Sequence, residues 1–409
     1  MVYTLLSECL DQRLPWGTLT GIRPVKIARR LLEKGDVPEK VREYMESEYL
    51  CSKERAELSV SIADKEIRLL DTSTNNRDEK SYSLYIGIPF CSTTCLYCSF
   101  TSYPIPQKGD LVKRYIKALK SEIDFAAETF IDRPLTSVYF GGGTPTALSA
   151  EELSDLISYL NERVLGQSQR SHKEGVLEFT VEAGRPDSIT KEKLIALKEQ
   201  GVNRISVNPQ TLKEETLRLI GRHHTNEDFF KAYDLAREVG FNCINADIIL
   251  GLPGETIEDL ERTLDKIVTV KPDNLTVHSL AIKRSARLNI DFDKYKNSYM
   301  ENSALHMERV HDAAKRLGME PYYLYRQQNM AGNLENIGFS VTGKECIYNC
   351  AIIEEVQDIV ALGAGAACKK IIFKDGVALK TERCENVKDV DTYIERIEEM
   401  KKRKSMLFL

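Results

Sequence analysis

The sequence predicts an α/β protein built around a partial (β/α)6 barrel. From Ser81 onward, short β-branched and aromatic runs alternate with amphipathic segments of helical length, and this rhythm is absent before Ser81 and after Asp291. The strand-like runs are 82–89, 137–140, 177–182, 204–208, 243–250 and 274–281. The helical segments between them are 111–130, 150–165, 191–200, 213–220, 227–239 and 257–270.

Three regions follow from this rhythm. Residues 1–80 are predicted to form a helical N-terminal extension, with helices over 38–52 and 53–71. Residues 81–290 form the barrel. Residues 291–409 are expected to be an α+β C-terminal region that covers the substrate. The helices expected there are 298–317 and 390–402, with a tyrosine-rich stretch between them.

Bulk composition describes an ordinary globular chain. Of 409 residues, 42% are hydrophobic and 29% are charged, and the net charge of -5 disfavours a nucleic-acid scaffold. No apolar stretch approaches the roughly 18 residues needed to span a bilayer, so we expect a cytoplasmic protein that engages neither membrane nor nucleic acid. Ten cysteines in that compartment favour metal binding or chemistry over disulfides.

The strongest local pattern is a loop of three cysteines directly after the first strand. Cys91, Cys95 and Cys98 are separated by three and two residues, and loops at this end of barrel strands carry active sites. Cysteine thiolates bind iron-sulfur clusters, and three ligands on a four-iron cubane leave one iron open. S-adenosylmethionine (SAM) can chelate that iron and accept an electron from the cluster. A zinc site and three free thiols are the alternatives.

A glycine run follows the second strand. Gly141, Gly142 and Gly143 let backbone groups approach a ligand closely, and Thr144 adds a hydroxyl. Alone, such a run is often only a turn. Next to the cysteine loop, it predicts contact with SAM.

Together these two motifs resemble the signature of the radical SAM superfamily. Further stretches are similar to the oxygen-independent coproporphyrinogen III oxidase family. They are Tyr85-Ile86-Gly87-Ile88-Pro89-Phe90, Val138-Tyr139-Phe140, Gly201-Val202-Asn203-Arg204-Ile205-Ser206, Gln210, Leu219-Ile220-Gly221-Arg222, and Asp247 with Gly251-Leu252-Pro253-Gly254. The HemZ-type coproporphyrinogen dehydrogenase branch is the most similar. That similarity rests on Leu19-Thr20-Gly21-Ile22-Arg23-Pro24-Val25-Lys26 and Asn333-Leu334-Glu335-Asn336.

The resemblance implies a set of SAM contacts, which fall at or near strand ends. They are Tyr85, Glu182, Gln210, Arg222, Asp247 and Ala281. A carboxylate such as Asp247 can accept hydrogen bonds from ribose hydroxyls, and Arg222 offers a planar fork to the methionyl carboxylate. The alternatives are a surface ion pair for Arg222, a barrel-mouth cap for Glu182 and a core position for Tyr85.

The resemblance also implies a reaction. In the family, a deoxyadenosyl radical removes a propionate hydrogen from coproporphyrinogen III, and loss of two carboxyl groups leaves two vinyls, giving protoporphyrinogen IX in oxygen-independent heme biosynthesis. The implied cofactors are a four-iron four-sulfur cluster and SAM, and the implied electron donor is a flavodoxin or a ferredoxin. The tyrosine-rich stretch Tyr322-Tyr323-Leu324-Tyr325-Arg326 is expected to help hold the substrate.

Two other functions are compatible with the motifs. Family members often carry one more cysteine where this chain has Phe100, and some members without it are heme-trafficking proteins. Their His-Asn-x-x-Tyr-Trp heme motif is absent here, because Gly332-Asn333-Leu334-Glu335-Asn336-Ile337 stands in its place. A different radical SAM reaction, such as methyl transfer to a tetrapyrrole, is the second alternative.

Three further features have weaker assignments. Cys346, Cys350 and Cys368 could hold a second metal, although dispersed thiols are commonly buried hydrophobes. His223 and His224 follow Arg222, and an ordinary loop position is the favoured interpretation for them. The basic run could attract substrate carboxylates, but a solvated face is favoured. Its members are Arg23, Lys26, Arg29 and Arg30.

Overall fold

The computed structural model describes most of the chain. The described residues are 2–11, 13–21, 23–73, 81–99, 102–105, 109–166, 178–283, 286–291, 295, 302–327, 330, 332, 334–374 and 377–409. Phe100, Asn333 and the first residues of the helix predicted over 298–317 lie outside these ranges.

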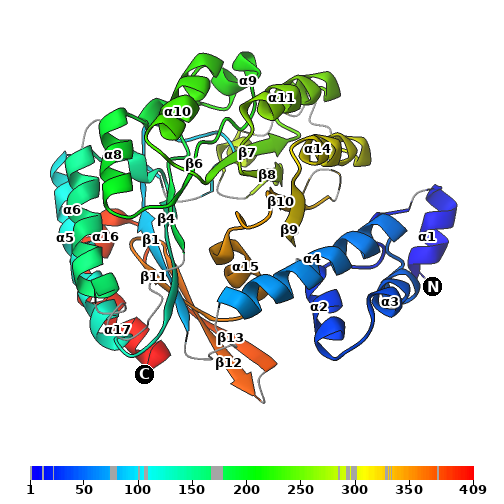
Figure 1. The fold of residues 1–409 in the computed structure, drawn as a ribbon, viewed down its shortest axis with the longest axis horizontal. Coiled ribbons are helices and arrows are strands. Elements are labelled where there is room, and N and C mark those ends of the chain that lie inside the picture. Colours follow the sequence, from blue (N-terminus) through cyan, green and yellow to red (C-terminus); the bar gives the residue numbers. More distant parts are fainter. Residues whose placement is uncertain are drawn as a thin grey trace.

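Six parallel strands form the centre of the sheet, as the sequence predicts. They are β1 (Tyr82–Ile88), β4 (Leu135–Gly142), β5 (Glu178–Glu182), β6 (Arg204–Ser206), β7 (Ile244–Leu250) and β8 (Asn274–Ser279). Neighbours in this order are hydrogen-bonded and parallel. Their carboxyl ends therefore meet at one edge, and the predicted partial-barrel fold class is confirmed (Figure 1).

Crossover helices cover the outer face of these strands (Figure 1). They are α5 (Gly109–Thr129), α6 (Ala150–Leu160), α8 (Lys191–Glu199), α9 (Glu214–Leu219), α10 (Asn226–Glu238) and α11 (Ile257–Val270). Capping boxes fix the start of α6, α10 and α11, because a Ser or Thr hydroxyl and an acidic side chain three residues later satisfy each other's backbone N–H groups. The segment predicted as one helix over 150–165 ends as a π-helical turn, Asn161–Leu165.

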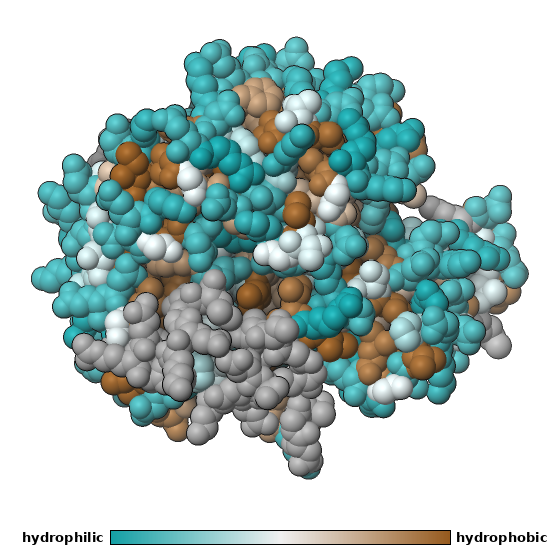
Figure 2. Space-filling model, in the orientation of Figure 1, coloured by the Kyte–Doolittle hydropathy of each residue, from teal (hydrophilic) through white to brown (hydrophobic). Residues whose placement is uncertain are grey.

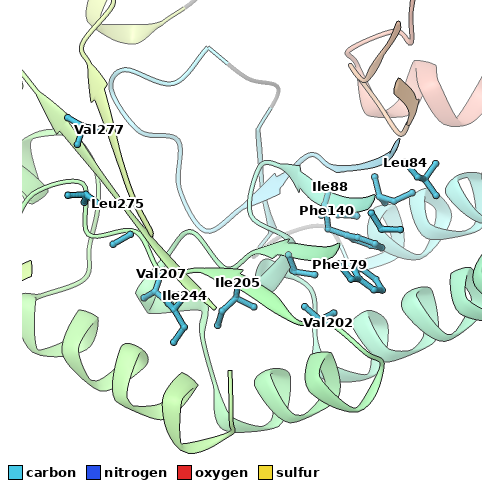
Figure 3. Close-up of a cluster of buried hydrophobic side chains, with 14 of the residues drawn as sticks. Leu84, Ile88, Phe140, Phe179, Val202, Ile205, Val207, Ile244, Leu275 and Val277 are labelled. Carbon is cyan, nitrogen blue, oxygen red and sulfur yellow. The ribbon is translucent and has the colours of Figure 1, made fainter. Parts of the chain in front are cut away.

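Apolar side chains fill the space between the strands and these helices (Figure 3). Leu84, Phe140, Ile205 and Val277 belong to one buried cluster, which includes residues from every central strand. Each fully buried large side chain of this kind contributes about 1.5–3 kcal/mol relative to an exposed position. In β5 and β8 the apolar residues of this cluster alternate with polar ones along the strand, so only one face of these two strands is apolar.

The C-terminal region extends this sheet at both edges, so it holds eleven strands among the described residues. On one side β11 (Asp358–Leu362) pairs in parallel with β1, and β12 (Ala367–Lys374) and β13 (Val377–Glu385) follow it. On the other side β10 (Asn336–Ser340) lies between β8 and β9 (Glu320–Tyr325), which contains most of the tyrosine-rich stretch. The sequence rhythm did not reveal these strands.

Two predicted C-terminal helices differ from the observed ones. The described part of the first, α14, runs only over Ala304–Arg316. The terminal helix is broken at Arg396 into α16 (Val390–Glu395) and α17 (Ile397–Phe408). Another helix, α15 (Ile347–Glu354), packs against β9 and the long N-terminal helix α4.

The N-terminal residues are helical, as expected. They form α1 (Val2–Leu10), α2 (Val25–Glu33), α3 (Pro38–Tyr49) and α4 (Lys53–Ser73). Trp16 Nε1 donates to Glu335 Oε2 at 2.8 Å, and Arg55 pairs with Glu335 Oε1 at 2.8 Å. These bonds tie the N-terminal helices to the residue before β10, and the division into three domains stays a prediction.

One face of the molecule can be described by its hydropathy. Figure 2 shows a mostly hydrophilic face on which hydrophobic side chains occur in small groups. None of the helices in the described ranges combines the length and the apolar character needed to cross a membrane.

Candidate functional site

The three-cysteine loop begins at the carboxyl end of β1 and is fixed by neighbouring loops. Its first cysteine lies in β2 (Phe90–Cys91), which pairs with β3 (Tyr103–Pro104). Leu96 N donates to Ile220 O and Leu96 O accepts from Leu288 N, both at 2.9 Å. Cys91 and Cys95 are buried and Cys98 is half-buried. The loop therefore has a defined backbone conformation.

The glycine turn after β4 packs directly against this loop. Gly143 N donates to Ile88 O and Thr144 N donates to Phe90 O, both at 2.7 Å. A Cβ atom at Gly143 would lie 2.5 Å from Phe90 O, so only glycine permits this approach. Thr144 Oγ1 lies 3.4 Å from Cys91 Sγ. The two sequence motifs thus form one wall.

A cavity of about 320 Å³ opens beside this wall. Most of the site residues predicted from the sequence line it. They are Cys91, Cys95, Cys98, Gly142, Gly143, Thr144, Glu182, Gln210, Arg222, Asp247 and Ala281. Gly141 does not line it, although a Cβ there would lie 3.1 Å from Glu182 Cδ. Ala281 follows β8 rather than ending it, and bridges to Met330. The cavity brings together residues in or just after six strands, and Asp247 lies in the middle of β7 rather than at its end.

Tyr85 lies in β1, behind the cavity wall rather than on it. Its ring stacks with Tyr139 and Tyr348, each with centroids 6.2 Å away. Tyr85 is not among the residues that line the cavity, and its contact with SAM stays a prediction.

Two carboxylates that face the cavity have different surroundings. Burial raises the pKa of Glu182 to about 7, against the opposing effect of a 2.6 Å hydrogen bond from Tyr139 Oη. The Asp247 carboxylate accepts from Asn208 Nδ2 at 2.8 Å and from Asn245 Nδ2 at 2.7 Å. Glu182 can therefore gain or lose a proton near neutral pH, whereas two amide donors orient Asp247 as an acceptor.

Gln210 and Arg222 carry buried polar atoms at the cavity. Gln210 adopts a φ of 66° while its backbone bridges to Ile248. Arg222 Nη2 donates to Gly184 O at 2.5 Å and to Asn208 O at 2.8 Å, which already uses part of the fork expected for a ligand carboxylate. Within the described part of the chain, Gln210 Oε1 and Arg222 Nε have no hydrogen-bond partner.

Several cavity residues were missed by the sequence analysis. They are Tyr97, Ser99, Gly184, Arg185, Asn208, Ile249, His278, Ser279, Leu280, Lys283, Gln327 and Asn336. Arg185 and Asn208 follow β5 and β6 closely, so a polar residue just after a strand was the available signal. Gln327 and Asn336 come from the C-terminal region, whose neighbours in the sheet were not predictable from local pattern.

The later cysteines have separate local partners. Cys346 Sγ lies 3.3 Å from Glu178 Oε1, Cys350 Sγ lies 3.7 Å from Tyr322 O, and Cys368 Sγ lies 3.3 Å from Ala361 O. Cys368 lies on β12, whereas the other two belong to α15 and its N-cap. No group of three or more His, Cys, Asp or Glu residues suited to one metal ion occurs among the residues described. This holds for the three loop cysteines as well, which would bind different irons of a cluster rather than one ion.

Three of the four residues of the basic run, which lies on and just before α2, face glutamates rather than the cavity. Arg23 pairs with Glu355 at 2.6 Å, Lys26 lies 3.8 Å from the same carboxylate, and Arg29 lies 3.7 Å from Glu354. The sequence favoured a solvated face for this run. The structure corrects that expectation, because α2 docks at the carboxyl end of α15. Arg30 is exposed.

Two other expectations concern substrate contacts and the histidines. Tyr325 lines the cavity, but Arg326 Nη1 donates to Leu19 O at 2.7 Å and so faces the N-terminal region.

His223 is exposed. His224 is buried, and desolvation lowers its pKa to about 3. His224 is therefore neutral at physiological pH.

Comparison with known proteins identifies the family. The model of the radical SAM superfamily matches residues 85–267. The oxygen-independent coproporphyrinogen-III oxidase-like protein HemZ of Bacillus subtilis is 41% identical over 387 residues, covering 94% of this chain and 75% of that protein. The chain belongs to this radical SAM family.

Two further relatives place the family in context. The heme chaperone HemW of Bacillus subtilis is 39% identical over 49% of this chain and 51% of its own length. The solved structure of the Escherichia coli coproporphyrinogen III oxidase HemN, a radical SAM enzyme, superposes with a TM-score of 0.60. That match covers 81% of this chain and 72% of HemN at 23% identity, and it shows the shared fold.

Radical SAM proteins use a four-iron four-sulfur cluster and SAM, and the residues at the cavity fit both groups. Three thiols on one loop match the donor set of a cluster with an open iron. In the absence of metal, burial raises the pKa of Cys91 to about 11, so a thiolate there needs a cationic partner such as iron. The unpartnered Gln210 Oε1 supplies an acceptor beside them.

Proposed function

We propose that this chain oxidatively decarboxylates two propionates of coproporphyrinogen III, giving protoporphyrinogen IX in oxygen-independent heme biosynthesis in the cytoplasm. A flavodoxin or a ferredoxin would supply the electron. The similarity to HemZ along 94% of the chain supports the substrate class.

One observation carries the proposal. The cysteine loop, the glycine turn and the polar ends of β5 to β8 surround a single cavity. No single one of these elements specifies a radical enzyme. Their convergence supports the proposal, because three cysteine thiols border the same cavity as a carboxylate, an amide and a guanidinium, which are groups suited to a zwitterionic nucleoside such as SAM.

When bound, the cluster and SAM supply the radical that removes a hydrogen atom from the substrate. Cys91, Cys95 and Cys98 would hold the cluster. Asp247 accepts hydrogen bonds from a ligand hydroxyl, since its two amide donors fix its orientation. The remaining wall, which includes Tyr325, limits the access of water to the reacting atoms.

An anaerobic turnover assay tests the function. Reconstituted protein is mixed with SAM, a reductant and coproporphyrinogen III, and the products are analysed by mass spectrometry. We expect 5'-deoxyadenosine together with a tetrapyrrole that has lost two carboxyl groups. Formation of 5'-deoxyadenosine without that loss would contradict the proposed reaction and favour another radical chemistry.

Heme trafficking is the second candidate, because HemW matches half of the chain at 39% identity. Tight heme binding without tetrapyrrole turnover in the same preparation would favour it. Iron content and SAM cleavage are measured in every sample, so that a preparation without its cluster is not mistaken for a trafficking protein.

A further inference from the structure

Arg185 lies immediately behind the cysteine loop. Its guanidinium donates from Nη1 to Thr93 Oγ1 at 2.8 Å, and the same nitrogen lies 3.7 Å from Cys95 Sγ. The side chain is only 3% exposed and borders the cavity. A buried cationic donor therefore points at one of the three thiols assigned to the cluster.

Asp187 holds this guanidinium in place from the opposite side. Arg185 Nε and Nη2 donate to the two oxygens of Asp187 at 3.0 and 3.1 Å, which is the bidentate geometry that fixes an arginine most firmly. Ser92 Oγ also donates to Asp187 Oδ2, at 3.0 Å. The pair thus contacts three parts of the loop, at Ser92, Thr93 and Cys95.

Reduction of an iron-sulfur cluster adds negative charge, part of which resides on its sulfur ligands. Hydrogen bonds to those sulfurs and nearby positive charge favour the reduced state and raise the reduction potential. In a buried setting this interaction is weakly screened. A donor fixed in position does not need to reorganise when the electron arrives.

We propose that Arg185 is a positioning residue that raises the reduction potential of the cluster through its N–H to Cys95 Sγ, and that Asp187 fixes it in that position. The inference rests on the proposed assignment of the cluster to Cys91, Cys95 and Cys98. It concerns how readily the cluster is reduced and is independent of the identity of the substrate.

The test is an EPR-monitored redox titration of the reconstituted full chain without SAM or tetrapyrrole. In R185M we expect the equilibrium constant for reduction to fall about tenfold, which lowers the midpoint potential by about 59 mV for one electron. R185Q is the second variant, since its amide keeps a polar contact with the loop while it removes the charge, and its midpoint should also fall.

Arg204 offers a matched control. It is 5% exposed, and its Nη1 donates to Cys243 Sγ at 2.5 Å and to Lys344 O at 2.8 Å, so R204M also removes a buried arginine bonded to a sulfur outside the loop. Its midpoint should match that of the unaltered chain. A change of less than twofold in R185M or R185Q at full iron content would overturn the inference, as would an equal change in R204M.

Iron content separates this inference from the proposed function. An unaltered chain that binds no cluster refutes the assignment of the cysteines. A loaded chain whose midpoint does not depend on Arg185 refutes only the inference. Hydrogen exchange of the loop in the metal-free protein gives an independent measurement, with faster exchange expected in R185M and D187N than in R204M.

Discussion

Two buried polar regions of the molecule differ in how completely they are hydrogen-bonded. The first joins the C-terminal helices to α5, where Lys404 and Glu122 are both fully buried. Glu122 accepts from Lys404 at 2.5 Å, Asn386 at 2.9 Å, Tyr393 at 2.7 Å and Gly363 N at 2.7 Å. The charged groups of this network pair with one another, so the network stabilises the packing of the C-terminal helices on α5.

The second region is the cavity wall, where polar atoms are left without hydrogen-bond partners. Gln210 Oε1 and Arg222 Nε have none among the described residues, and the carboxyl of Glu182 has a pKa of about 7 because it is buried. Unpartnered buried atoms cost about 1–3 kcal/mol each. A binding site can keep such atoms despite this cost, because a bound ligand supplies the missing hydrogen-bond partners.

Missing partners alone do not mark a site, however. Both carboxyl oxygens of Glu66 and of Glu354 also have no hydrogen-bond partner in the described structure, yet these side chains lie between packed helices and border no cavity described here. The difference is access. Unpartnered polar atoms support the proposed ligand site because they meet an opening and a donor set beside the cysteine loop.

The largest effect is expected from removing a cluster ligand. In C95A only two thiols of the loop remain, so iron should fall to background and SAM cleavage should cease. Iron analysis and absorbance spectra of the reconstituted protein measure this. C350A is the control, because Cys350 is fully buried and its Sγ bonds to Tyr322 O away from the loop, and it should keep its iron. Equal iron loss in both variants would contradict the assignment.

Disruption of the buried network around Glu122 is expected to lower stability strongly without abolishing SAM cleavage. K404M leaves the Glu122 carboxylate buried without its cation, so the free energy of unfolding should fall by about 3–5 kcal/mol. Denaturant unfolding measures it. Lys401 lies on the same helix as Lys404, and K401M removes its 3.1 Å hydrogen bond to Ser121. This change should lower the free energy of unfolding by about 1 kcal/mol or less. Equal losses would show that burial of the pair is unimportant.

Substitution of Asp247 is expected to lower the affinity for SAM without unfolding the protein. D247N replaces a charged acceptor by an amide that also confronts the Asn208 and Asn245 donors, and hydrogen bonds to charged groups contribute about 1.5–3 kcal/mol. The Kd for SAM should therefore rise about 10- to 100-fold by equilibrium dialysis. D273N is the control, since Asp273 pairs with Arg237 at 2.7 Å outside the cavity. An unchanged Kd in D247N would remove Asp247 from the site.

The smallest effect concerns Glu66. Burial, and then the charge of Glu354, raise the pKa of Glu66 above its ordinary 4.5. The folded state therefore holds a proton that the unfolded state releases, so stability falls as pH rises above about 4.5 toward the folded pKa. E66Q should lessen this fall and gain about 1–3 kcal/mol at pH 8. Urea unfolding at pH 5 and pH 8 compares the two, and a parallel pH dependence in E66Q would contradict the assignment.

The central sheet was predictable because short runs rich in β-branched and aromatic residues recur between amphipathic segments of helical length. The pairing of β11 with β1 was not, since nothing local in residues 358–362 indicates a partner more than 270 residues earlier. The break at Arg396 was missed for a similar reason, because the polar pattern continues through it.

The site was predictable where spacing carried the information. Cys91, Cys95 and Cys98 are close in sequence, and the glycine turn follows a recognisable strand. Arg185 was missed because its partners, Thr93 and Cys95, are about 90 residues away. The resemblance located Arg222 but did not show that two backbone carbonyls already occupy Nη2.

The most direct test of the central claim is the EPR spectrum of the reduced, reconstituted protein before and after the addition of SAM. If the cavity is where SAM meets the open iron of the cluster, the spectrum should change on addition, and D247N should need more SAM for the same change. A cluster spectrum that SAM leaves unaltered would contradict the account, because it would separate the three cysteines from the cavity they border.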